Sequence, residues 1–185
     1  MTDSIDRIDP RDRAELFESA KQFAAPLEIT PRVLAHDRRN AALHEAGHCI
    51  EAWHRGIHCE AMIKPEPNRG DWDKTWTGRT RFLKPIYQWQ IGDADRLHIA
   101  LAGEIAVFRG GSDYDPDFTR ENLLDEMTWD EAALMSHADW HLTGYEPGQV
   151  DRRFMRAVER VYDRFDRDMP TLYRVARDLI VRARP

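Results

Sequence analysis

The spacing of apolar residues along the chain predicts mostly helices. Between residues 30 and 56, apolar side chains recur every three or four positions, which marks one buried helix face, at Leu43, Ala46, Ile50 and Trp53. Pro31 suits the first turn of that helix, and Gly56 stands where it should end. The same periodicity predicts further helices over 95–109, 129–142, 150–165 and 169–180, and an amphipathic one after Asp9-Pro10.

Two short strands and one acidic segment interrupt the helical pattern. Residues 59–64 and 76–83 are predicted strands, separated by a loop rich in proline and charge. Residues 112–128 are predicted to be an irregular, solvated acidic loop. Asp113, Asp115 and Asp117 alternate there, but an EF-hand would need glycine and glutamate where the chain has Phe118 and Leu124.

These elements predict a mainly α fold, a helical bundle with a small antiparallel β-hairpin. We expect residues 1–30 to be a polar segment with one amphipathic helix, and residues 31–185 to be a single domain. A length of 185 residues with 42% hydrophobic residues is enough for one sizeable core. Trp53, Trp140 and Cys49 are expected in that core, and Gly47 is expected where a second element approaches the first predicted helix.

Charge and cysteine content narrow the class of protein. A formal net charge of −6 argues against nucleic acid or an anionic membrane as the main partner. No run approaches 18 apolar residues, and residues 1–13 are too charged for a signal peptide, so we expect no membrane segment. Two cysteines do not make a disulfide framework, which favours a reduced, cytoplasmic enzyme.

The most specific chemical signal is the sequence His44-Glu45-Ala46-Gly47-His48. On a helix, positions i and i+4 share one face with Cβ atoms about 5–6 Å apart, so both imidazoles can bind one metal ion. The alternative is a pair of ordinary core histidines, but both lie beside the apolar stripe, where an unpaired imidazole would be costly. In zinc peptidases with this pattern, the glutamate acts as the general base.

Residues 42–53 resemble the motif helix of the FtsH-type zinc peptidases. The order of elements is also similar: the motif helix, a short hairpin, then a small-residue helix around Leu101-Ala102-Gly103. The resemblance implies a zinc-dependent endopeptidase, with His44 and His48 as Zn²⁺ ligands and Glu45 as catalytic base. It also implies a third ligand, an aspartate on a later helix, for which Asp139 is the best match.

Other residues compete with Asp139 for the third position. His137 and His141 flank it, and either could be a ligand or could orient one. Glu104 is a further alternative, because other HExxH enzymes take a glutamate from the next helix. Asp113, two residues past the double glycine, is the weakest candidate.

The chain also departs from the family pattern. Family members usually carry an arginine and two acids where this chain has Glu104, Val107 and Phe108, and the chain has no G-x-x-x-x-G-K-[ST] loop for ATP. We therefore expect a peptidase without its own motor, which acts on unfolded, flexible or short polypeptides. Its partner would be a separate unfoldase or further copies of itself, and substrate could pair with strand residues 77–82. The alternatives are an inactive zinc-binding interaction module and a peptidase specific for one regulator.

Overall fold

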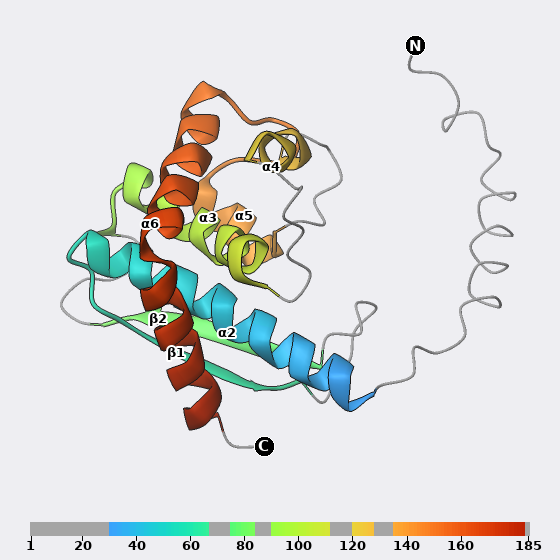
Figure 1. The fold of residues 1–185 in the computed structure, drawn as a ribbon. Coiled ribbons are helices and arrows are strands. Elements are labelled where there is room, and N and C mark those ends of the chain that lie inside the picture. Colours follow the sequence, from blue (N-terminus) through green and yellow to red (C-terminus); the bar gives the residue numbers. More distant parts are fainter. Residues whose placement is uncertain (1–29, 67–74, 84–89, 112–119, 128–134, 184–185) are drawn as a thin grey trace, which may run out of the picture. The chain divides into compact units, whose positions relative to one another are not determined.

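The computed structural model describes residues 30–66, 75–83, 90–111, 120–127 and 135–183 (Figure 1). It confirms a mainly helical fold with a two-stranded antiparallel sheet. The elements are α2 (Pro31–His54), β1 (Cys59–Pro65), β2 (Trp76–Phe82), α3 (Asp93–Gly110), α4 (Arg120–Met127), α5 (His137–Thr143) and α6 (Arg152–Arg182). The amphipathic helix predicted after Asp9-Pro10 lies outside the described residues. None of the described helices is both long and apolar enough to cross a membrane.

Helix α2 is the predicted motif helix, and its buried part runs from Ala42 to Ala52. Gly56 follows it in the left-handed conformation, with φ of 70°, which only glycine adopts at little cost and which stops the helix as predicted. Cys49 is a core residue as expected. The prediction for Trp53 is wrong: this side chain is 45% exposed, because the buried part of α2 ends one residue earlier.

The hairpin is confirmed, with β1 antiparallel to β2 and Ile63 opposite Gly78. In Figure 1 the two strands run alongside α2, from whose last turn β1 follows after a short link. One face of the hairpin is covered, since Ile63 and Trp76 belong to the main hydrophobic core. This placement brings β2 against the middle of α2.

Helices α2 and α3 approach each other at Gly47. A Cβ at this position would overlap the carbonyl oxygen of Ala102 and would lie 2.7 Å from the Cβ of Ala106. Only glycine therefore permits this backbone separation, which confirms the role predicted for Gly47. Helix α3 in turn packs against α5 and α6, so it lies between the motif helix and the C-terminal part of the chain.

The structure corrects the prediction for residues 112–128. Residues 120–127 form helix α4, whereas an irregular loop was predicted through 128, and residues 112–119 lie outside the described part. The physical reason is that Leu123 is buried and Leu124 packs against the same core, so two apolar residues within an acidic segment anchor a helical turn. The alternating residues Asp113, Asp115 and Asp117 lie outside the described part.

The predicted helix over 129–142 is corrected at residues 135 and 136, whereas residues 129–134 lie outside the described part. Met135 and Ser136 are not helical, and α5 begins only at His137, because the Ser136 side chain caps it by accepting a hydrogen bond from the Asp139 amide. Trp140 is buried in the core as expected. Gly144 and Gly148 have positive φ, which confirms the turn predicted after this helix.

The two C-terminal helices predicted from periodicity are the two halves of α6. Asp168 interrupts the helix with φ of −119° and ψ of 22°, two residues before Pro170. Proline lacks an amide hydrogen and its ring clashes with the carbonyl four residues earlier, so a kink is expected at this point. Both halves bury apolar side chains in the main core, among them Phe154, Phe165 and Leu172.

Candidate metal centre

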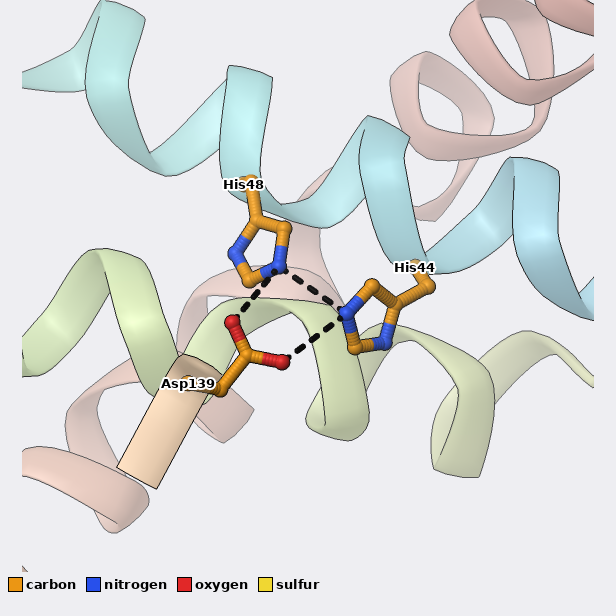
Figure 2. Close-up of side chains that lie close together, drawn as sticks. All are labelled: His44, His48 and Asp139. Atoms are coloured by element: carbon orange, nitrogen blue, oxygen red, sulfur yellow. Dashed lines mark hydrogen bonds and ion pairs between the residues drawn. The ribbon is translucent and has the colours of Figure 1, made fainter. Parts of the chain in front are cut away.

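His44 and His48 project from the same face of α2 toward helix α5 (Figure 2). Their Nε2 atoms are 3.0 Å apart, and the two rings meet edge to face with centroids separated by 4.6 Å. Both histidines lie within the buried stretch of α2. The side chain of His44 is 21% exposed and that of His48 is 8% exposed. The helical spacing thus places two nitrogen donors at one point, as the sequence predicted.

Asp139 meets these nitrogens from α5. Its Oδ2 lies 3.2 Å from Nε2 of His44, and its Oδ1 lies 3.4 Å from Nε2 of His48. One donor atom from each of the three residues lies within 4.8 Å of the others. Two imidazole nitrogens and one carboxylate oxygen in this arrangement could hold a metal ion.

Ser136 holds the carboxylate of Asp139. The Ser136 hydroxyl donates to Oδ2 of Asp139 at 2.6 Å and accepts from the Asp139 amide at 3.1 Å. This reciprocal pairing resembles a capping box, whose S-x-x-E spacing is here S-x-x-D, and it fixes both the start of α5 and the direction of the carboxylate. The prediction from sequence missed the role of Ser136, although the S-x-x-D spacing could have revealed it.

Helix α3 supplies two further features that orient the histidines. Nδ1 of His48 donates to the carbonyl oxygen of Ile99 at 2.7 Å, which fixes the tautomer and leaves the Nε2 lone pair free for a metal. At Gly103, a Cβ would lie 2.6 Å from Nε2 of His48 and 2.7 Å from Cε1 of His44. The imidazoles therefore fit against α3 only because residue 103 is glycine, and no motif in the sequence marks either contact.

The protonation of the three residues is strongly coupled. Burial lowers the pKa of His44, but the hydrogen bond and the charge of Asp139 outweigh burial and raise it to about 9. Burial raises the pKa of Asp139, but its contacts with His44 and His48 lower it to about 2. Burial and the neighbouring positive charge of His44 lower the pKa of His48. Without a metal, His44 therefore carries the proton that a metal ion would displace.

Glu45 follows His44 on α2, and its carboxylate is hydrogen-bonded to strand β2. Its side chain is buried, at 5% residue exposure, and its Oε2 accepts a hydrogen bond of 2.6 Å from the Thr80 hydroxyl on β2. The glutamate expected to act as a base is thus held by a neutral donor from the hairpin. No local pattern in the sequence marks Thr80 for this contact, because the two residues are 35 positions apart.

The other candidates for the third ligand lie elsewhere. Glu104 is on the opposite side of the His44 ring, with Oε2 3.9 Å from Nδ1. His137 and His141 are exposed on α5, and within the described residues neither belongs to the metal-binding group. Asp113 lies outside the described residues. The residues that the structure brings together are therefore His44, His48 and Asp139.

A cavity of about 440 Å³ lies at a different place, beside the kink in α6. Its lining residues are His54, Arg164, Arg167 and Asp168, and it contains none of the three metal-binding candidates. The three residues that could hold a metal ion lie instead where α2, α3 and α5 meet.

Comparison with known proteins identifies no relative: neither a family model nor a curated protein matches the sequence. The resemblance to FtsH-type peptidases therefore rests on the motif helix and the order of elements. The cluster of His44, His48 and Asp139, which could hold a metal ion, is a geometric observation independent of that resemblance.

Proposed function

We propose that this protein is a zinc-dependent metalloendopeptidase that hydrolyses unfolded or flexible polypeptides without an ATPase of its own. The single observation that carries the proposal is the convergence of His44, His48 and Asp139 beside the buried Glu45. Two imidazoles and one carboxylate are the ligand types that zinc takes in peptidases, and three protein ligands leave a fourth position open. The identity of the metal is part of the proposal.

Each side chain has a distinct task in this proposal. When bound, zinc would polarise the scissile carbonyl and lower the pKa of an attacking water molecule toward neutrality. Glu45 takes the proton from that water and passes it to the leaving amine. Asp139 offsets part of the metal's charge, while Ser136 and the Ile99 carbonyl keep two of the ligands in their orientations.

The outer edge of β2 is suited to bind an extended polypeptide. In the antiparallel ladder Leu83 donates to the carbonyl of His58 and Glu66 donates to that of Thr75, so alternate β2 residues between 75 and 83 pair with β1. The backbone groups of Gly78 and Thr80 then face away from β1. A substrate strand could pair there by backbone hydrogen bonds, which would give weak sequence preference.

Two further expectations remain part of the proposal. The two cysteines, Cys49 and Cys59, are free thiols, which suits a reducing compartment such as the cytoplasm. A separate unfoldase or assembly into a homo-oligomer would supply what a fused motor supplies in FtsH-type enzymes. Without such help the protein should cleave only chains that are already unfolded, flexible or short.

The test combines metal analysis with cleavage of casein as an unfolded protein. We expect about one zinc per chain, cleavage that a chelator abolishes, and recovery when zinc is restored. Asp139→Ala should lose zinc, with affinity weakened by at least about 10–100-fold, whereas His141→Ala, an exposed change on the same helix, should keep it. Unchanged zinc in Asp139→Ala would refute the ligand set. Full zinc without cleavage of any substrate would favour a non-catalytic zinc-binding module.

A further inference from the structure

Strand β2 makes a close contact with the carboxylate of Glu45. The Thr80 hydroxyl donates to Oε2 of Glu45 at 2.6 Å and also lies 3.4 Å from the Glu45 carbonyl oxygen. At Gly78, a Cβ would lie 2.5 Å from Oε1 and 2.7 Å from Cδ of the same glutamate. The carboxylate therefore lies against two residues of one strand, and the absence of a side chain at one of them makes the contact possible.

The alternation of the strand explains why these two residues act together. Side chains at i and i+2 of a strand point to the same face, so Gly78 and Thr80 both face α2, whereas Thr77, Arg79 and Arg81 face the other side. The register with Ala61 and Ile63 of β1 fixes this orientation. A shift by one residue would remove both the hydroxyl and the space for the carboxylate.

We propose that Thr80 is a positioning residue for the catalytic base, a role that rests on the peptidase function proposed above. A glutamate side chain has three rotatable bonds, and burial alone does not select one direction for its carboxylate. The bond from Thr80 occupies Oε2, which leaves Oε1 to accept the proton of the attacking water. Gly78 makes room for this orientation.

The same strand residues connect the base to the substrate edge. The backbone groups of Gly78 and Thr80 face away from β1, while the side-chain face of both residues meets Glu45. A polypeptide that pairs with this edge would thus be placed relative to the base by a single rigid strand. Thr80 would set the distance and direction between the scissile bond and the carboxylate.

The experiment compares Thr80→Val, which has the same shape without the hydroxyl, with Thr80→Ser, which keeps the donor. Thr77→Val is the matched control. The backbone of Thr77 pairs with Lys64 of β1 and not with the outer edge, and its side chain lies on the other face of β2. All three proteins are first checked for unchanged zinc content and melting temperature. We expect Thr80→Val to lower kcat on casein by about 10–100-fold, as for loss of a hydrogen bond to a charged group, with KM unchanged. Thr80→Ser should remain near wild type.

A second readout does not depend on cleavage. In the protein loaded with Co²⁺, the visible absorption spectrum changes with pH as a bound water ionises. A carboxylate that moves away removes a nearby negative charge, so the midpoint of this change should move to lower pH in Thr80→Val and should not move in Thr77→Val.

The outcomes separate the two proposals. If wild type cleaves nothing but Thr80→Val still shifts the cobalt midpoint, the peptidase proposal fails and the positioning of Glu45 stands. If Thr80→Val retains the wild-type kcat, or if its cobalt titration matches that of wild type, the positioning role is refuted. An equal loss of kcat in Thr77→Val would refute it as well, because the effect would then belong to the hairpin as a whole.

Discussion

Two buried glutamates on α2, six residues apart, have opposite surroundings. Glu51 is fully buried and pairs with the guanidinium groups of Arg55 and of Arg164, the latter at 3.0 Å. Glu45 is almost as buried, but its hydrogen-bond donor among the described residues is the neutral hydroxyl of Thr80. The carboxylate of Glu51 is paired with two cations and is held as part of the framework. The carboxylate of Glu45 is instead held by a hydroxyl.

The two carboxylates also connect different parts of the structure. The arginine partners of Glu51 come from the turn that follows α2 and from α6. Arg55 also pairs with Asp95 of α3, so the ion pairs connect three helices. Glu45 instead lies where α2 meets β2, beside the cluster of His44, His48 and Asp139 that could hold a metal ion. Burial is similar in both cases, and the chemistry of the partner distinguishes the structural acid from the candidate base.

The largest expected effect is on activity, in Glu45→Gln. Loss of the proton acceptor should lower kcat by about 10²–10⁴-fold, the usual contribution of a general base, while zinc content and stability remain close to wild type. Casein cleavage and metal analysis on the same preparation measure both. Undiminished cleavage would show that Glu45 is not the base.

The next effect is on stability, in Glu51→Gln. Removal of one partner from a buried ion network leaves Arg55 and Arg164 without their counter-charge, and we expect a loss of about 3 kcal/mol in the free energy of unfolding measured with urea. Glu60→Gln is the control, because its pair with Arg81 is exposed and should change stability by less than about 0.5 kcal/mol. Equal losses of stability in the two variants would show that the buried ion network of Glu51 contributes no more than an exposed ion pair.

A smaller effect is expected from Gly78→Ala. The added methyl group would press on the Glu45 carboxylate and disturb its bond to Thr80, so kcat should fall by about tenfold or more with zinc retained. Gly92→Ala is the control, since a Cβ there meets no atom within 4 Å. Loss of zinc in Gly78→Ala would mean that this strand supports the metal ligands and not the base.

The proposed zinc binding should depend on pH through the protonation of His44. Because the pKa of His44 is raised to about 9 in the metal-free protein, zinc must displace its proton. Apparent zinc affinity should therefore rise about tenfold per pH unit up to about pH 9 and level off above it. The same slope is expected in Glu51→Gln, and competition with a chromophoric chelator would measure it. A plateau already at pH 7 would contradict the coupling of His44 to Asp139.

The same shift predicts how the metal-free protein responds to pH. A histidine whose pKa rises from 6.5 to about 9 on folding contributes its stability in full below pH 6.5. That contribution should disappear as pH rises from 6.5 through about 9. Thermal unfolding of chelator-treated protein between pH 6 and pH 10 would detect it, and Asp139→Asn should flatten the curve.

The sequence predicted the local parts of the site well. His44 and His48 could be placed on one helix face because helical spacing alone brings positions i and i+4 together. The roles of Gly47 and Gly56 could be predicted because they follow from the missing side chain of glycine. It permits close approach of another helix at Gly47 and a left-handed helix end at Gly56. Asp139 was reached only through a family resemblance, and the structure brings it to the two histidines.

Local signals failed where contacts from distant segments decide the outcome. Trp53 continues the apolar stripe of α2, yet it is exposed, since the buried part of this helix ends at Ala52. Residues 120–127 appeared irregular because their acidic residues outnumber the two leucines that anchor α4. In both cases burial depends on what packs against the segment, which the segment itself does not encode.

Local patterns in the sequence are enough to predict the helix that carries His44 and His48, the hairpin, and two imidazole donors one helical turn apart. The groups that orient the site residues are visible only in the tertiary structure. Ser136 orients Asp139, the Ile99 carbonyl orients His48, and Thr80 orients Glu45. The reason is physical. A helix fixes neighbours three or four residues apart, but Ile99 and Thr80 lie 51 and 35 residues from the side chains they contact, and only packing of α2 against α3 and β2 brings them within hydrogen-bond distance.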